Sequence, residues 1–507
     1  MNESKIKEMF KHHNSEIIKI GCLVLLYFGT NIYLSFATDT YANFEAGFGK
    51  MAANMLYGNA RVIIALIYEL HYLSGLSLKS FYYISSILAL AFLGAAIWIM
   101  QKILTRYLNN ENQRILLSFI SIVNIFIIEY FMFMEKCGFM LAILFNILGI
   151  FFIESFFRTG NKKHFGCAIL SIGLAVFTYQ STIALFMILC MLFVYKYADN
   201  FKKYIFNLFY VGIAYIIPVV MSMCTLKFVF QSKRIDNGQD ELVNIISDLN
   251  RDSNLKNYVY EQLKRLFIDT FKILPSYYFG IILLVVIFIS VALACFGKNS
   301  MRQIVHIIFI GSASCIFSAA PMLAGGWPAM RILYPFASII GSLVINIYVN
   351  QFEYTQRFKH KLWKITNAVV MFAVTVLLIG QYFSFNKVCI DKYKLNLADE
   401  IRSDYVGQAI SDYQDNTGNI VTKIAFYQDA SITYPPYPDL YCDGDLIVSS
   451  FYTSWSDISA LNYYLGTDYQ KIDREEKYIE YFSNKDWWRL SQEQLIFDGD
   501  TLHLCVY

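Results

Sequence analysis

The sequence predicts an α-helical polytopic membrane protein with about 11 transmembrane helices and a small C-terminal domain outside the membrane. The chain of 507 residues is 56% hydrophobic and only 16% charged, with a mean hydropathy of +0.43. A soluble domain of this length could not bury so much apolar surface. The segment from Lys387 onward differs, because it holds 20 Asp and Glu against 10 Lys and Arg.

Long apolar runs set the number of spans, since a bilayer-crossing helix needs about 20 residues. The first run has no small-x-small cleavage site, so we expect it to stay as a span and not to be removed as a signal peptide. The predicted spans lie near 17–36, 81–100, 115–133, 138–157, 165–178, 182–198, 204–226, 277–296, 303–320, 332–350 and 365–385.

Basic residues fall almost entirely into every second gap between these runs. They are Lys5, Lys7, Lys11; Lys102, Arg106, Arg114; Arg158, Lys162, Lys163; Lys196, Lys202, Lys203; Lys298, Arg302; Arg357, Lys359, Lys361 and Lys364. The opposite short gaps hold only Lys136 and Arg331. The positive-inside rule therefore predicts a cytoplasmic N-terminus and an extracytoplasmic C-terminal domain.

The expected organisation is a membrane domain over 1–385 and an extracytoplasmic soluble domain over 386–507, with larger outer loops at 37–80 and 227–276. In the first loop, Tyr41, Phe44, Phe48, Met51 and Met55 recur at spacings of three and four. This stripe predicts an amphipathic helix in the membrane plane. Residues 61–73 are apolar but short, and we interpret them as an interfacial or re-entrant helix, because a further span would move every downstream basic loop outside.

The C-terminal segment has β-like runs at 423–427, 445–451 and 501–506, which predict a small α/β or α+β domain with a half-buried strand at its end. Cys442 and Cys505 could pair as a disulfide, although their spacing also suits unpaired thiols. No spacing of cysteines suggests zinc. The basic membrane part and the acidic C-terminal part together argue against a nucleic-acid partner.

Two outer gaps contain carboxylates that could carry chemistry. Asp39, just after the first span, could cap the following helix or act as a general base, because desolvation at the membrane surface raises a carboxylate's proton affinity. Glu135 could form a local ion pair with Lys136 or face the same surface as Asp39. Glu129 lies within a span, where a carboxylate usually faces the protein interior or a cavity.

The remaining candidates are polar or cationic. Tyr179 and Gln180 could satisfy backbone groups of a tight turn or hydrogen-bond a sugar. Arg331 follows Trp327 and could be a snorkelling anchor. Outer arginines are scarce, however, so Arg331 and Arg61 are the natural ligands for a lipid phosphate, whose oxygens a guanidinium matches bidentately.

The sequence has no phosphate-binding glycine motif for a nucleotide. The outer face of a cell also lacks nucleotide sugars, so an enzyme working there needs a differently activated donor. A polyprenyl phosphate is the obvious carrier. Such chemistry needs a carboxylate for the acceptor hydroxyl, a cation for the leaving phosphate and an apolar surface for the lipid.

With these residues in view, the chain resembles the polytopic GT-C glycosyltransferases, and most closely the serotype-converting O-antigen glucosyltransferase family. The resemblance covers roughly 17–385. It rests on the order of Asp39-Thr-Tyr, Asn59-Ala-Arg61, the Glu135 turn, Tyr179-Gln180 and Arg331. The chain departs from the family pattern at Ala60 and Val62, where Gly and Pro are expected, and Asp39 has no adjacent second acid.

The resemblance implies a multi-pass enzyme of the bacterial cytoplasmic membrane. It would transfer a hexose, glucose by this likeness, from a polyprenyl phosphate to a cell-surface polysaccharide or lipid-linked glycan, with inversion and without metal or other cofactor. A flippase and a donor synthase are further partners that this reaction implies. The roles implied are catalysis for Asp39 and Glu135, donor-phosphate binding for Arg331, Arg61 and Lys136, and substrate binding for Tyr41, Glu45, Tyr179, Gln180 and Trp327.

Two other functions stay open at the sequence level. A polysaccharide polymerase or ligase would normally carry a large arginine-rich outer loop, and loop 227–276 is only weakly basic. A lipid-linked-sugar flippase or another transporter would show paired charges at mid-membrane and symmetry between its halves. The sugar, the acceptor, the linkage and the oligomeric state are not readable from the sequence.

Overall fold

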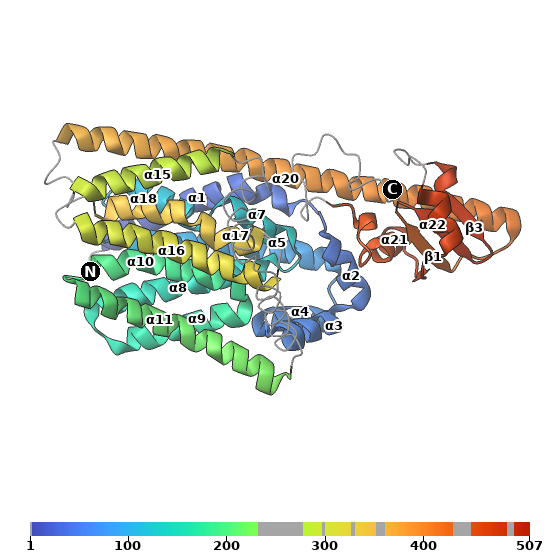
Figure 1. Cartoon of the computed structure of the whole chain (residues 1–507), viewed down its shortest axis with the longest axis horizontal. Helices are drawn as coiled ribbons and strands as arrows, with labels where there is room; N and C mark the ends of the chain where they lie inside the picture. Colours follow the sequence, from blue (N-terminus) through green and yellow to red (C-terminus); the bar gives the residue numbers. More distant parts are fainter. Residues whose placement is uncertain are drawn as a thin grey trace, which may run out of the picture. The chain divides into compact units, whose positions relative to one another are not determined.

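The protein is described by a computed structural model that covers residues 3–231, 277–296, 300–325, 330–350, 360–428, 448–483 and 491–506 (Figure 1). Its contacts divide the chain into two compact units. Unit 1 comprises residues 1–32, 52–131 and 135–386, and unit 2 comprises residues 33–51, 132–134 and 387–507. The predicted outer loop 227–276 lies outside the described residues from position 232 onward, as does Trp327.

All regular secondary structure in the described part of unit 1 is helical. Its helices are α1 (Glu3–Phe28), α4 (Val62–Ser74), α5 (Leu78–Leu104), α6 (Glu111–Ile122), α7 (Ile128–Met132), α8 (Lys136–Thr159), α9 (Lys162–Thr178), α10 (Ala184–Lys196), α11 (Phe201–Cys224), α15 (Tyr277–Phe296), α16 (Ser300–Gly325), α17 (Met330–Ala337), α18 (Ile339–Val349) and the first part of α20 (His360–Thr417). Short helical turns η1 (Gly29–Ile32), η2 (Asn54–Gly58), η3 (Ile125–Ile127), η4 (Gln180–Ile183) and η5 (Thr225–Val229) connect several of them.

Six described helices are long and apolar enough to cross a membrane, and the number rises to seven if α6 and the bent segment after it form one span. This confirms a helical membrane protein. Helices occupy all eleven predicted runs, but several are short. For example, α10 has 13 residues, which extend only about 20 Å against the roughly 30 Å of a bilayer core. The prediction of eleven complete spans therefore stays untested.

The short helix α10 lies inside the helical unit. Every residue from Ala184 to Tyr195 is buried, and α10 contacts α8, α11, α16 and α18. A helix that is apolar on all sides is stable only when it is enclosed. We conclude that α10 forms part of the packed centre around which the longer helices are arranged.

Asn124 explains why the predicted span 115–133 is bent. The chain bends by 59° between residues 111–122 and 125–132, because residues 123 and 124 are extended. The Asn124 side chain accepts a hydrogen bond from the Phe126 amide and donates to the Tyr334 carbonyl and the Ser338 hydroxyl. The Asn124 side chain therefore bonds a backbone amide that the helix break leaves without a helical partner, and it links this segment to α17.

Gly341 allows α18 to approach this same region closely. A Cβ atom added at Gly341 would lie 2.5 Å from the Ile120 carbonyl oxygen and from the Ser121 Cα atom. Both are backbone atoms, which cannot move aside as a flexible side chain can. The helix pair α6 and α18 therefore requires glycine at this position.

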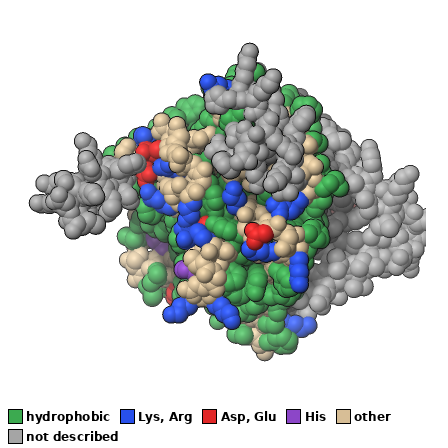
Figure 2. Space-filling view, turned by 90° about the vertical axis from the view of Figure 1, so that its left-hand side faces the viewer, with side chains coloured by type: hydrophobic (Ala, Val, Ile, Leu, Met, Phe, Trp, Pro, Cys, Tyr) green, Lys and Arg blue, Asp and Glu red, His purple; other side chains and the backbone are tan. Residues whose placement is uncertain are grey.

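Contacts within unit 1 bring together predicted gaps that lie far apart in the sequence. The gaps with many basic residues meet one another, since Glu154 of α8 pairs with Arg106 and accepts a hydrogen bond from Tyr197. Arg302 donates to the Ala198 carbonyl in the same way. Figure 2 shows Lys and Arg side chains gathered on this end of the molecule. Several of the predicted basic gaps thus lie together in space, while the topology and the orientation in the cell stay predictions.

Unit 2 contains α2 (Thr38–Ala46), α3 (Phe48–Ala53, shared with unit 1), the remainder of α20, α21 (Asp457–Leu465) and α22 (Glu476–Ser483). Its strands are β1 (Lys423–Tyr427), β2 (Gln470–Lys471), β3 (Leu495–Asp498) and β4 (Thr501–Cys505), with short turns η8 (Ser450–Tyr452) and η9 (Gln492–Gln494). The sheet has the order β2-β1-β4-β3, in which β1 is parallel to β2 and β4 and β3 is antiparallel to β4.

Helices cover both faces of this sheet. Leu502 and Leu504 pack with residues of α20 and α21, whereas Cys505 packs with Phe482 of α22. All five residues of β4 are consequently buried. The predicted half-buried terminal strand is wrong in this respect, because β4 is a central strand with a helix layer on each side.

The predicted strand at 445–451 is also wrong where the structure describes it. Residues 450–452 form η8, and the Ser450 amide donates to a carboxylate oxygen of Asp399 at 2.8 Å. The Ser449 hydroxyl donates to the other oxygen at 2.6 Å. The Ser450 amide is therefore bonded to the buried Asp399 carboxylate, and it cannot form a hydrogen bond to a neighbouring strand. Cys442 lies outside the described residues, so its pairing with the buried Cys505 stays a prediction.

We predict that Gly341→Ala destabilises the protein by about 1–3 kcal/mol, because the added methyl group meets rigid backbone. The thermal unfolding midpoint of the purified protein in detergent measures this effect. Gly212→Ala on α11 is the matched control, since a Cβ there meets nothing within 4 Å. Equal midpoints for the two variants would contradict the close approach of α18 and α6.

Candidate functional site

Glu129 and Arg331 form an ion pair in unit 1 whose carboxylate is buried. The Glu129 carboxylate is 3% exposed and accepts hydrogen bonds from both the guanidinium and the backbone amide of Arg331. The next residue on α7, Tyr130, donates its hydroxyl hydrogen to the Arg331 carbonyl oxygen at 2.7 Å. Two successive residues of α7 therefore fix the start of α17. Glu129 faces the protein interior, as its sequence position suggested.

The Arg331 side chain is nevertheless 36% exposed. The positive charge of Arg331 is largely balanced by the Glu129 carboxylate, because that carboxylate is buried and water screens buried charges only weakly. Arg331 can therefore present donors to a further ligand, but with less net positive charge than an arginine without a carboxylate partner. This weakens its predicted role as a ligand of a phosphate.

Arg61 is held differently. It precedes α4, and its guanidinium carbon lies 4.5 Å from the centre of the Tyr179 ring. Within the described part of the chain, no carboxylate lies within 4 Å of its nitrogen atoms. A guanidinium stacked on an aromatic face keeps its edge available for hydrogen bonds. Arg61 is thus the stronger candidate for binding an anion.

The turn before Arg61 has an unusual backbone. Ala60 adopts a φ of 49°, a left-handed conformation that costs a residue with a Cβ atom about 1–2 kcal/mol. Glycine adopts it without this cost, and glycine is the residue that the resemblance expects here. Ala60 is also fully buried. The backbone at position 60 therefore favours glycine, and Ala60 tolerates the strain through packing.

Two tyrosines connect Arg61 with Arg331. Tyr179 lies under Arg61, and its ring centre is 5.8 Å from that of Tyr130 in an edge-on arrangement. Tyr130 in turn bonds to Arg331. The Gln180 side chain donates to the Asn59 carbonyl at 2.8 Å. Tyr179 and Gln180 thus hold Arg61 and the turn before it, a role that fits the backbone-satisfying interpretation better than direct contact with a sugar.

Glu135 and Lys136 diverge although they are neighbours. The Glu135 carboxylate is 7% exposed and accepts a hydrogen bond from the hydroxyl of Tyr68 on α4 at 3.0 Å. The Lys136 ammonium group is buried and lies 3.7 Å from the centre of the Tyr82 ring. Neither side chain is open to solvent. Their geometry favours structural roles that join α8 to α4 and α5.

Asp39, Tyr41 and Glu45 belong to unit 2, where α2 packs on α21. Asp39 is exposed in the first turn of α2, where its negative charge interacts favourably with the helix dipole. Its Oδ1 atom accepts a hydrogen bond from the indole nitrogen of Trp455 at 3.1 Å. Among the described residues, the other carboxylate oxygen makes no hydrogen bond and is available to a ligand.

Glu45 and Tyr41 attach α2 to the C-terminal part of the chain. Glu45 accepts a hydrogen bond from Ser459 of α21, and the Tyr41 hydroxyl pairs with that of Tyr464. Burial raises the pKa of Tyr41 well above its ordinary value, so the hydroxyl stays protonated. Because Tyr41 is fully buried, it supports α2 and does not contact a substrate in this conformation.

The predicted helix in the membrane plane is wrong in its continuity. Gly47 adopts a φ of 75° and separates α2 from α3. The first half therefore turns toward α21, to which Tyr41 and Glu45 are bonded. Sequence periodicity could not reveal this contact, because the partner lies more than 400 residues away, as the separation of 416 residues between Asp39 and Trp455 illustrates.

Within each unit, the structure adds contacts made by residues that the sequence did not assign. Tyr130 and Tyr68 hold Arg331 and Glu135, and Lys392 of α20, which is 1% exposed, interacts electrostatically with Asp39 and Asp399. No cluster of His, Cys, Asp and Glu among the described residues could hold a metal ion.

Comparison with known proteins gives no assignment. No protein-family model matches the chain, and no curated protein is similar enough to match it.

We predict that Glu129→Gln destabilises the protein by about 2 kcal/mol. The substitution leaves the Arg331 guanidinium with a neutral partner in a poorly solvated place, and partial exposure of Arg331 keeps the effect below that of a fully buried pair. Thermal unfolding of the purified protein provides the measurement. The double variant Glu129→Gln/Arg331→Gln should recover part of the loss, and a purely additive double variant would argue against the pair.

Proposed function

We propose that the protein transfers a hexose, with glucose as the first candidate, from a polyprenyl-phosphate carrier to a cell-surface polysaccharide on the outer face of the bacterial cytoplasmic membrane. The main support is Arg61, which is stacked on Tyr179 and has no carboxylate within 4 Å among the described residues. Arg61 is linked through Tyr179 and Tyr130 to a second, partly exposed arginine, Arg331. Two such guanidinium groups are suited to bind a lipid phosphate.

In the proposed reaction, Asp39 accepts the proton of an acceptor hydroxyl. The oxygen attacks the anomeric carbon, and the bond from that carbon to the phosphate oxygen breaks on the opposite face. The electron pair leaves with the polyprenyl phosphate, whose developing charge Arg61 and then Arg331 stabilise. The configuration is thereby inverted. The hydrogen bond from Trp455 to one carboxylate oxygen of Asp39 orients the other oxygen toward the hydroxyl.

The proposal keeps the predicted topology, in which eleven spans place the N-terminus in the cytoplasm and unit 2 outside. It departs from the sequence-based roles in two ways. Arg61 becomes the principal phosphate ligand, because Glu129 neutralises much of the charge of Arg331. Glu135 and Lys136 become structural residues, because both side chains are buried against aromatic rings or hydroxyls.

A transporter of lipid-linked sugars is the second candidate. Its support is the buried pair of Glu129 and Arg331, because paired charges within a membrane domain are typical of transport pathways. The two candidates differ in covalent chemistry, since a transporter leaves the bond between sugar and phosphate intact.

We predict that Asp39→Asn lowers sugar transfer by about 100-fold or more, because general-base catalysis contributes on the order of 10²–10⁴ in rate. The assay uses the purified full chain in liposomes with radiolabelled polyprenyl-phosphoryl glucose, and with surface polysaccharide from cells that lack the protein as acceptor. Asp412→Asn, at an exposed position on α20, is the control. Full activity of Asp39→Asn would show that Asp39 is not the base. If the wild type and all variants leave the donor uncleaved, the result would favour transport.

We predict that Arg61→Lys raises the KM for the donor by roughly tenfold and changes kcat less, because an ammonium group cannot make the bidentate contact or stack on Tyr179 as a guanidinium does. Initial rates at varied donor concentration separate the two constants. Arg158→Lys, an exchange at the other end of unit 1, should leave both unchanged. An unaltered donor KM in Arg61→Lys would show that the phosphate binds elsewhere.

A further inference from the structure

A cavity of about 410 Å³ lies between α1 and α5 in unit 1. All ten residues that line it are apolar or glycine, including Ile17, Val24, Leu90 and Trp98. Gly21 of α1 and Gly94 of α5 both line it, and a Cβ atom at either position would meet nothing within 4 Å. The space exists because each helix has a glycine where a larger side chain would fill the gap.

The cavity opens toward the surface of two helices that can cross a membrane. Ile17 and Leu25, which line it, are 53% and 55% exposed. Water does not fill a wholly apolar space at this depth, because it would find no hydrogen-bond partners. The hydrocarbon chain of a lipid is the solvent available there. From Ile17 to Leu25 the cavity extends about 12 Å along the helix, which is close to the depth of one leaflet, roughly half of a 30 Å core.

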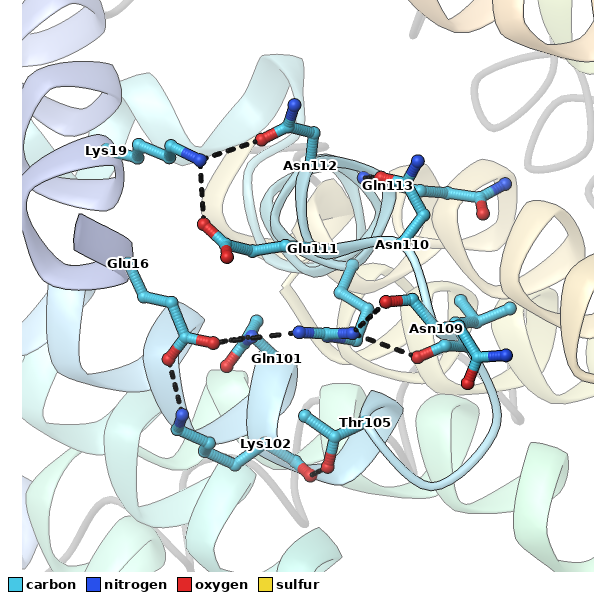
Figure 3. Close-up of polar contacts among 12 residues, drawn as sticks. Glu16, Lys19, Gln101, Lys102, Thr105, Asn109, Asn110, Glu111, Asn112 and Gln113 are labelled. Carbon is cyan, nitrogen blue, oxygen red and sulfur yellow. Dashed lines mark hydrogen bonds and ion pairs between the residues drawn. The ribbon is translucent and has the colours of Figure 1, made fainter. Parts of the chain in front are cut away.

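One end of the cavity borders a cluster of charged side chains, which Figure 3 shows in close-up. Glu16 pairs with Lys102 and Arg114, and Lys19 pairs with Glu111 at 2.7 Å. Among the side chains that the structure describes here, three cations thus meet two carboxylates, an excess of one positive charge. Lys19 is 46% exposed, so its ammonium group can reach a ligand in the headgroup region.

Trp98 connects the apolar cavity with this cluster. Its ring lines the cavity, and the Lys102 ammonium group lies 5.5 Å from the ring centre. Tryptophan typically occupies the boundary between the hydrocarbon and headgroup regions of a bilayer. The cavity therefore complements a single lipid, because its length is apolar and its end near Trp98 borders cationic side chains.

We propose that this cavity binds one anionic glycerophospholipid. An acyl chain would lie between α1 and α5 beside Gly21 and Gly94, and the phosphate would contact Lys19 near the cationic end. The predicted orientation makes this the cytoplasmic leaflet. The site is separate from the arginines proposed to bind the sugar donor, because the cationic end belongs to the set of basic gaps that meet at the other end of unit 1. The lipid would fill a packing defect and hold α1 against α5.

Native mass spectrometry of the full chain, released from nanodiscs that contain phosphatidylglycerol, tests this proposal. The wild type should retain one phosphatidylglycerol. Gly94→Leu fills the cavity from α5 and should weaken retention by roughly tenfold, since each lost methylene contact reduces binding. Gly21→Leu fills it from α1 and should act alike. Gly212→Leu on α11 is the control, because that glycine has the same open surroundings.

Lys19→Gln tests the choice of headgroup. It should reduce the preference for phosphatidylglycerol over phosphatidylcholine by about fivefold, the contribution expected of one basic residue near an anionic headgroup. Equal lipid retention in Gly94→Leu, Gly21→Leu and wild type would overturn the proposal. It would also be overturned if Gly212→Leu lost the lipid equally, or if undecaprenyl phosphate displaced phosphatidylglycerol from the wild type.

Discussion

The pairing of Glu129 with Arg331 is the interaction on which the arrangement of the candidate site depends. A carboxylate buried in a membrane domain is costly unless it is charged against a partner and fully hydrogen-bonded. Glu129 meets this condition by binding both the side chain and the backbone of Arg331. The pair fixes α7 on α17, and Asn124 extends the same contact to Tyr334 and Ser338. The bend in the third predicted span is therefore part of the site's construction.

The aromatic residues around the arginines have a second role besides packing. Tyr130 and Tyr179 contact each other between Arg61 and Arg331. The Tyr179 ring packs against the Arg61 guanidinium, and the Tyr130 hydroxyl holds the backbone carbonyl of Arg331. A rigid guanidinium loses little entropy when it binds an anion. The two arginines differ in net charge, because only one has a carboxylate partner among the described residues. In the proposed function, this difference suits Arg61 to bind the phosphate and Arg331 to add a weaker positive potential.

Unit 2 shows how a short first loop and a distant C-terminal domain form one structure. Asp39, Tyr41 and Glu45 each bond to a residue between 455 and 464. The long helix α20, with 58 residues, carries the chain from unit 1 into the sheet domain. In the reaction proposed above, the C-terminal part of the chain would orient Asp39 through its hydrogen bond from Trp455.

The sequence by itself determined that the protein is a helical membrane protein, that helices occupy the predicted apolar runs, and that β1 and β4 form near 423–427 and 501–505. These features follow from hydrophobic period and run length, which are local properties. Only the tertiary structure decided that Glu129 is the partner of Arg331, that Lys136 is buried under Tyr82, and that Trp455 bonds to Asp39. Each of these contacts joins residues separated by 50 to 400 positions or more. Such pairs are specified by how helices pack, and no local pattern in the chain records that packing.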